Sequence, residues 1–178
     1  MKIIATALLT AALGLTAAPA AAETWSGKDP AHDHVVPGGE DFEGRGDIVA
    51  VRVDHAPRKV YVDTEFRTGP YDEMSIFLNT RKARKGPEFV LHKTYFGVSL
   101  WTTGPGHRLV ERVKCADKRV RLKGETWKAY VARDCLANPN GSAPSRVKVL
   151  VRSADETYLN TVDWARGRNR ATPWIHVN

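Results

Sequence analysis

The stretch Lys59-Val60-Tyr61-Val62-Asp63-Thr64-Glu65-Phe66 alternates between two kinds of side chain. Every second position from Val60 onward carries a side chain that suits a core, and the positions between them carry a tyrosine and two carboxylates. A period of two places successive side chains on opposite faces of an extended backbone. The stretch therefore predicts a β-strand that is buried on one face and solvated on the other.

The same alternation, rich in β-branched and aromatic residues, recurs on both sides of this stretch. The other strand candidates are 47–53, 74–79, 89–94, 98–101, 108–114, 119–123, 126–131 and 146–152. Turn signals separate them, for example Thr68-Gly69-Pro70, Gly104-Pro105-Gly106 and Asn138-Pro139-Asn140-Gly141. Nine short strands without a convincing amphipathic helix predict an all-β fold, an antiparallel, jelly-roll-like β-sandwich over residues 47–152.

The two ends of the chain depart from this pattern. Lys2, the apolar run from Ile3 to Leu15 and the small residues Ala20 to Ala22 have the three-part pattern of a secretory signal peptide. We therefore expect residues 1–22 to be removed and the mature protein to be secreted, with no transmembrane segment, because the apolar run is too short to span a bilayer. Residues 23–46 do not alternate and predict an irregular leader, whereas 153–178 predict a C-terminal strand or an arm.

The chain is basic and contains two cysteines. It has 178 residues, enough for one domain with a core, and a net charge of +7. Positive charge gathers at 81–85 and at 166–170. Such runs are usually solvated loops, but they also suit an anionic wall polymer, and no specific nucleic-acid motif is present. In an oxidising compartment, Cys115 and Cys135 predict one disulfide.

No motif in the sequence specifies a reaction. His32-Asp33-His34 offers ligands for zinc or copper, but the same residues suit a polar leader. Asp54-His55 offers a general base, but there is no serine in a nucleophile elbow. Carboxylates that might pair in glycoside hydrolysis are Asp63, Glu65, Asp72, Glu73 and Glu88. In each case we favour a polar surface, so the prediction is no catalytic residue, no metal and no cofactor.

The tryptophans are the strongest candidates for recognition, because aromatic rings offer apolar area to a sugar face. Trp127 alternates with Ala129 and Val131, which predicts a core position. Trp101 precedes a Gly-Pro-Gly turn, where either a rim or a core position is open, and Trp164 and Trp174 lie in a basic tail where exposure is expected. Trp101, Trp164 and Trp174 are therefore the predicted ligand-binding residues.

Five short segments carry a family resemblance. They are Gly46-Asp47-Ile48-Val49, Lys59-Val60-Tyr61-Val62, Ser75-Ile76-Phe77-Leu78-Asn79-Thr80, Gly86-Pro87-Glu88-Phe89 and Arg146-Val147-Lys148-Val149. Their order resembles the antiparallel sandwiches of the family-nine carbohydrate-binding modules and the related DOMON-like domains. In those domains the turn after the third strand often carries acidic residues, whereas Arg81 here argues against a hard cation at that turn. The chain also resembles small exported actinobacterial proteins.

These observations predict a non-catalytic secreted binding domain for a cell-wall or extracellular polysaccharide. Two alternatives stay open: a small secreted hydrolase, and a structural envelope protein without a small ligand. A pocket lined by carboxylates would favour the hydrolase, and a groove carrying exposed tryptophan would favour carbohydrate binding.

Overall fold

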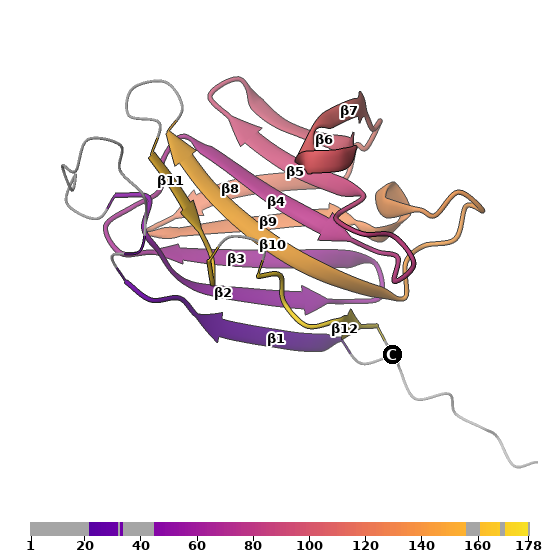
Figure 1. The fold of residues 1–178 in the computed structure, drawn as a ribbon, viewed down its shortest axis with the longest axis horizontal. Helices are drawn as coiled ribbons and strands as arrows, with labels where there is room; N and C mark the ends of the chain where they lie inside the picture. Colours follow the sequence, from indigo (N-terminus) through magenta and orange to yellow (C-terminus); the bar gives the residue numbers. More distant parts are fainter. Residues whose placement is uncertain (1–21, 32, 34–44, 156–160, 168–169, 178) are drawn as a thin grey trace, which may run out of the picture.

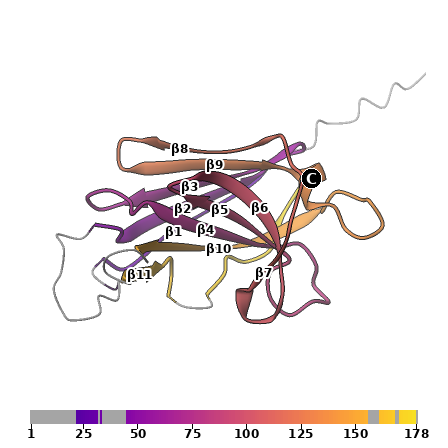
Figure 2. The same ribbon diagram turned by 90° about the horizontal axis from the view of Figure 1, so that it is seen from above.

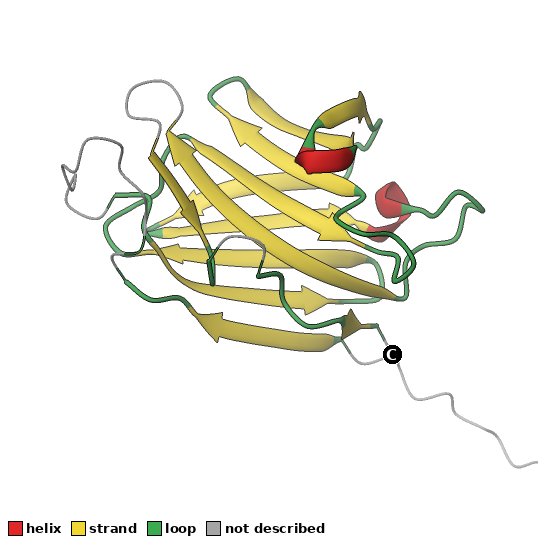
Figure 3. Cartoon of the chain, in the orientation of Figure 1, coloured by secondary structure: helices red, strands yellow, loops and turns green. Residues whose placement is uncertain are grey.

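The protein is a sandwich of two antiparallel β-sheets, which confirms the all-β fold (Figures 1 and 3). The computed structural model describes residues 22–31, 33, 45–155, 161–167 and 170–177. The expected signal peptide, except for Ala22, and half of the expected leader lie outside these ranges. The described part of the chain has no helix that is both long and apolar enough to cross a membrane.

The first sheet has five strands in the order β1-β2-β3-β9-β8. Their bounds are β1 (Glu23–Lys28), β2 (Ile48–His55), β3 (Lys59–Phe66), β9 (Thr126–Ala132) and β8 (Lys118–Lys123). The second sheet has seven strands, with the order β11-β10-β4-β5-β6-β7 and β12 pairing with β10. Their bounds are β11 (Thr161–Trp164), β10 (Arg146–Asp155), β4 (Glu73–Asn79), β5 (Phe89–Thr94), β6 (Gly97–Thr103), β7 (Leu109–Arg112) and β12 (Ile175–His176).

The chain crosses between the sheets after β3, after β7 and after β9. Two short 3₁₀ turns, η1 (Pro105–His107) and η2 (Arg133–Leu136), lie in the connections. Figure 2 shows β8 and β9 on one side of the molecule and β10 and β11 on the other. The main core lies between the two layers and is built from the inward positions of both sheets.

Strand β3 follows the predicted alternation. Val60, Val62, Thr64 and Phe66 are buried, and Tyr61 and Glu65 are exposed. Strands β4 and β10 differ, because most of their residues are buried on both faces. A second, smaller cluster around Phe77, Val90 and Leu150 covers the outer face of the second sheet. The outer face of the second sheet is therefore partly buried.

The prediction of an irregular leader over 23–46 is wrong for residues 23–28. These form β1, which pairs antiparallel with β2 along its whole length, and Trp25 packs against the core. Trp25 is the only large apolar side chain in β1, so no period could be read from the sequence. At the other end, β11 and β12 favour the strand alternative for 153–178, and β10 runs on to Asp155, past the predicted boundary at 152.

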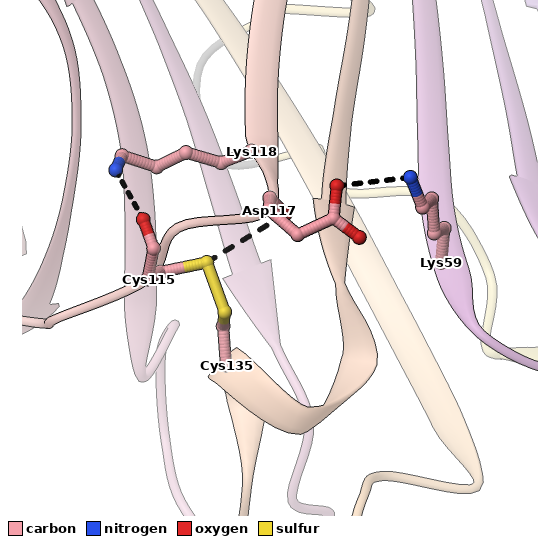
Figure 4. The surroundings of a disulfide bond; sticks show 5 residues. All are labelled: Lys59, Cys115, Asp117, Lys118 and Cys135. Carbon is pink, nitrogen blue, oxygen red and sulfur yellow. Dashed lines mark hydrogen bonds and ion pairs between the residues drawn. A yellow bond between two sulfur atoms is a disulfide. The ribbon is translucent and has the colours of Figure 1, made fainter.

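The predicted Cys115–Cys135 disulfide is present, with the Cα atoms 5.5 Å apart (Figure 4). It joins the segment before β8 to η2, the turn that follows β9. Beside it, the ammonium of Lys59 lies 2.9 Å from a carboxylate oxygen of Asp117, which ties the same segment to β3. The bridge therefore encloses the β8–β9 hairpin at one edge of the first sheet.

A buried histidine predicts a pH dependence of stability. His55 is fully buried, and its Nδ1 donates to the carbonyl oxygen of Ile175 at 3.0 Å. Burial lowers the pKa of His55, and Arg133 and His176 lower it further, against the hydrogen bond to Ile175 and the charge of Glu23. The unfolded chain therefore takes up a proton below about pH 6.5 before the folded protein does, so stability falls as the pH falls through that region.

We expect His55→Asn to remove this part of the pH dependence, because an asparagine amide can donate to the same carbonyl but does not titrate. The difference in free energy of unfolding between wild type and variant should shrink as the pH is lowered from 8 to 5, measured by urea unfolding. His176→Asn, at the exposed neighbour, should keep most of the pH dependence, because burial is the largest cause of the shift in the pKa of His55. A wild-type-to-variant difference that stays constant with pH would contradict the assignment.

Candidate functional site

The strand register places four large side chains in one row across the outer face of the second sheet. Leu150 of β10 stands opposite Phe77 of β4, Phe77 opposite Val90 of β5, and Val90 opposite Trp101 of β6. Directly opposite side chains on one face of a sheet are in contact range. The row is therefore a continuous apolar and aromatic band on the side turned away from the first sheet.

A polar row runs beside the apolar band. Arg152, Ser75, His92 and Ser99 stand opposite one another on the same four strands, two positions along. The hydroxyl of Ser75 lies 3.0 Å from Nδ1 of His92, and the indole N–H of Trp101 donates to Ser99 Oγ at 2.8 Å. Aromatic area flanked by hydroxyl, imidazole and guanidinium groups is typical of a site that orients a polar ligand.

Two segments from outside the sheet cover part of the band. The Trp164 ring of β11 stacks on Phe77 with 5.9 Å between centroids, and the His107 ring of η1 lies 4.8 Å from Phe77. Ala171, in the connection to β12, packs against the same cluster. The His107 and Trp164 rings also lie 6.2 Å apart, so three rings that are far apart in the sequence form one cluster.

A cavity of about 270 Å³ opens beside this cluster, and we call it the outer groove. It is slightly below the usual range of ligand pockets, about 300–1,000 Å³. Its described lining residues are Phe77, Asn79, Gly86, Pro87, His107, Lys148, Leu150 and Ala171. Phe77 and Leu150 supply the apolar surface, and Asn79, His107 and Lys148 supply the polar side chains. None of these residues is an aspartate or a glutamate.

Both basic runs of the sequence end at the outer groove. Gly86 and Pro87 directly follow the run 81–85, and Ala171 directly follows the run 166–170. Within the first run, a guanidinium nitrogen of Arg84 donates to the Thr103 carbonyl at 2.7 Å, which anchors the loop to β6. Lys82 and Lys85 of this run are exposed. The fold therefore places one end of each basic run next to the groove, although Lys148 is the only lysine or arginine in its described lining.

The three predicted tryptophans lie near this groove but are not exposed as expected. Trp101 and Trp164 pack against the cluster of Phe77, and both are half-buried. Trp174 is also half-buried, with the Lys148 ammonium 5.2 Å from its ring centroid. None of the three lines the cavity. They support its walls instead, because the surrounding strands and the C-terminal segment cover their rings.

The sequence missed the residues that line the groove. The available signal was a pair of runs that are apolar at consecutive positions, Ile76-Phe77-Leu78 in β4 and Val149-Leu150-Val151 in β10. A strand that is buried on both faces loses its alternation. Such runs in a sheet that is otherwise half-solvated indicate that something covers the outer face.

The candidate general base is ruled out by its surroundings. His55 is fully buried and its Nδ1 is used by Ile175, whereas Asp54 accepts hydrogen bonds from Thr24 and Arg52. His55 and Asp54 therefore belong to opposite faces of β2 and cannot act as a pair. His32 and His34 lie outside the described residues.

The carboxylates considered for hydrolysis are spread over the molecule. Glu88 is buried and accepts hydrogen bonds from the backbone N–H and the hydroxyl of Thr80, so it is a structural residue and not an exposed one. Asp63 forms an ion pair with Lys128 at 2.9 Å on the outer face of the first sheet, near exposed Glu65.

Asp72 and Glu73 line a separate cavity of about 440 Å³ together with Asp155 and the exposed ring of Tyr95. Asp72 is exposed, and Glu73 and Asp155 are half-buried. A glycosidase acid needs a carboxyl group that is desolvated enough to stay protonated. None of the three is buried to that extent.

No family model matches this chain, and neither a curated protein nor a solved structure matches it. The resemblance to family-nine carbohydrate-binding modules and DOMON-like domains therefore stays a prediction.

Proposed function

We propose that this protein is a secreted, non-catalytic binding domain that holds an anionic polysaccharide in the outer groove. The observation that carries this proposal is a groove that combines Phe77, Asn79 and Lys148, with one end of each basic run beside it. A sugar ring offers apolar C–H faces and polar hydroxyls, and an acidic sugar adds a negative charge. The groove offers a partner for each of these.

The apolar contacts come from Phe77 and Leu150, whose side chains are fixed by the strand register. The polar contacts come from Asn79, which offers an amide donor and acceptor, and from Lys148, whose ammonium provides charge-assisted hydrogen bonds. Trp164 and His107 contact the Phe77 ring and each other, which limits the movement of that ring. The groove is thus preorganised, which reduces the entropy lost on binding.

The absence of a carboxylate from the described lining of the groove favours binding over hydrolysis. The cavity beside Asp72 and Glu73 has carboxylates but no basic run around it. The disulfide supports secretion, because such bridges persist in oxidising compartments.

The proposal is tested by titrating purified residues 23–178 with oligosaccharides of matched length that are acidic or neutral, such as oligogalacturonate and a dextran oligomer. We expect the acidic chain to bind more tightly and its affinity to fall steeply between low and physiological salt, because the basic runs attract it through screened charges. Equal affinity for the two oligomers would contradict an anionic ligand.

Variants locate the site. We expect Lys148→Met to weaken binding of the acidic oligomer about 10- to 100-fold, because it removes a charge-assisted hydrogen bond of about 1.5–3 kcal/mol while the methionine keeps the packing of the aliphatic stem. Lys82→Ala with Lys85→Ala should weaken binding less and mainly reduce its salt dependence. Lys123→Ala, an exposed lysine of the first sheet, is the matched control. Loss of affinity in Lys123→Ala equal to that in Lys148→Met would show that only net charge matters.

A further inference from the structure

Four aspartates meet where the edges of the two sheets come together. Asp29 directly follows β1, and Asp33 lies five positions after the end of β1. Asp47 directly precedes β2, and Asp163 lies in β11. The end of β1, the start of β2 and β11 lie at the same end of the sandwich (Figure 1). One oxygen each from Asp29, Asp33 and Asp163 lies within 4.8 Å of the others. These three residues are called the aspartate cluster below.

The cluster is largely removed from water. Asp163 is 1% exposed and Asp29 is 8% exposed, whereas Asp33 is exposed. Oδ2 of Asp163 accepts the backbone N–H of Ile48, and Oδ1 of Asp29 accepts the backbone N–H of Arg166. Both hydrogen bonds cross between the two sheets. The cluster therefore lies at a seam that the fold already uses to join its layers.

The two buried carboxylates of the cluster, Asp29 and Asp163, differ from their neighbour Asp47 in their ion pairing within the described chain. The nearby carboxylate of Asp47 pairs with Arg67. Among the described residues, no lysine or arginine forms an ion pair with Asp29 or Asp163. The second oxygen of Asp29, Oδ2, is buried without any hydrogen-bond partner among the described residues. A buried carboxylate oxygen with no partner costs free energy, so something outside the described chain is needed to satisfy it.

The burial has an electrostatic consequence. Desolvation raises the pKa of Asp29 to about 7 and that of Asp163 to about 7, and the neighbouring carboxylates Asp33 and Asp47 raise both further. A cation bound between these carboxylates would offset both the burial and the repulsion.

We infer that the aspartate cluster binds a Ca²⁺ ion that joins β1 of the first sheet to β11 of the second. Ca²⁺ takes six to eight oxygen ligands at about 2.3–2.6 Å, so ligands on opposite sides of one ion are about 5 Å apart. The oxygens of the cluster fit within that separation. All three side chains are carboxylates, which suit a hard cation and not zinc or copper. Water would complete the coordination at exposed Asp33.

The inference departs from the prediction that the chain has no metal site. The proposed Ca²⁺ site does not involve the turn at Arg81, the residue that argues against a hard cation at that turn. It is also independent of the outer groove, so either conclusion can fail without the other.

The test is thermal unfolding of residues 23–178 in EDTA, in Ca²⁺ and in Mg²⁺ at equal ionic strength. Extracellular modules bind Ca²⁺ with Kd values of about 10⁻⁴–10⁻³ M, and saturation at 100-fold the Kd should raise the Tm by about 5–10 °C. Mg²⁺ should give a clearly smaller shift, because it keeps its own water and demands octahedral geometry. No shift in Ca²⁺, or equal shifts in the two ions, would overturn the inference.

Variants assign the effect to the cluster. Asp29→Asn keeps an acceptor for the N–H of Arg166 but removes one charge. We expect it to have a higher Tm than wild type in EDTA, because repulsion is relieved, and to lose the Ca²⁺ shift. Asp163→Asn should lose the shift as well, whereas Asp134→Asn, at an exposed aspartate of η2, should keep it. A full Ca²⁺ shift in both cluster variants would place the ion elsewhere and overturn the inference.

A second readout is independent of stability. Tb³⁺ replaces Ca²⁺ at oxygen sites and emits when a nearby tryptophan is excited, and Trp164 is the neighbour of Asp163 in β11. We expect sensitised Tb³⁺ emission from wild type that Ca²⁺ displaces, and none from Asp29→Asn. Emission of equal strength from Asp29→Asn would contradict the site.

Discussion

Replacing Trp127 with alanine is expected to lower the free energy of unfolding by about 3–5 kcal/mol, as large core truncations do. Trp127 lies in β9, is 8% exposed and belongs to the main core between the sheets. It stands opposite Thr64 of β3 and Leu122 of β8, so its ring packs across three strands of the first sheet. Alanine would leave a cavity on the core face of that sheet, between β3 and the edge strand β8.

The control for Trp127→Ala is Trp127→Phe. The indole N–H of Trp127 is buried with no hydrogen-bond partner among the described residues, so phenylalanine removes an unsatisfied donor while it keeps most of the volume. We expect Trp127→Phe to cost less than about 1.5 kcal/mol in urea unfolding. A loss of under 1 kcal/mol in Trp127→Ala would mean that this ring is not part of the core.

Removal of the disulfide is the second large effect. The chain-entropy model gives roughly 3 kcal/mol for a bridge that closes a loop of this size, because the reduced unfolded chain has more conformations. The sulfur atoms join residues separated by 20 positions, and Cys115 belongs to the buried core. We expect the double variant Cys115→Ala with Cys135→Ala to lose about 3 kcal/mol of free energy of unfolding. Alanine is chosen because a serine hydroxyl at position 115 would be buried.

The β8–β9 hairpin should loosen first in that variant, since the bridge and the Lys59–Asp117 ion pair anchor the segment before β8. Hydrogen exchange should therefore speed up in β8 more than in β4. Titration of thiols in the denatured, unreduced wild type is the check on the bridge itself. Two reactive thiols per chain would contradict it.

Much of the fold could be predicted from period and turn chemistry alone. Each of the nine strand candidates corresponds to a strand of the structure. Half-buried strands such as β3 alternate, and β4 and β10, which are buried on both faces, still contain apolar runs between turn signals. The strand β1 could not be predicted, since its pairing with β2 is made by backbone hydrogen bonds that leave no side-chain pattern. Likewise β11 and β12 are too short to show a period.

The candidate site could be predicted only in part. Trp101 and Trp164 were candidates because of their chemistry, and both pack against the Phe77 cluster, but their half-buried state depends on η1 and on the C-terminal segment. The row from Leu150 to Trp101 depends on strand register, which a single sequence does not reveal. The aspartate cluster joins Asp29 to Asp163, residues so far apart in the chain that only the folded arrangement brings them together.

NMR mapping of the bound oligosaccharide is the most direct test of ligand binding in the outer groove. Backbone amide shifts of ¹⁵N-labelled residues 23–178 are followed while the acidic oligosaccharide is added. We expect the largest changes in amide shift in β4, β10 and η1, around Phe77, Lys148 and His107. Shifts confined to the cavity beside Asp72 and Tyr95, or to the face of the first sheet around Asp63 and Lys128, with none at the outer groove, would contradict it.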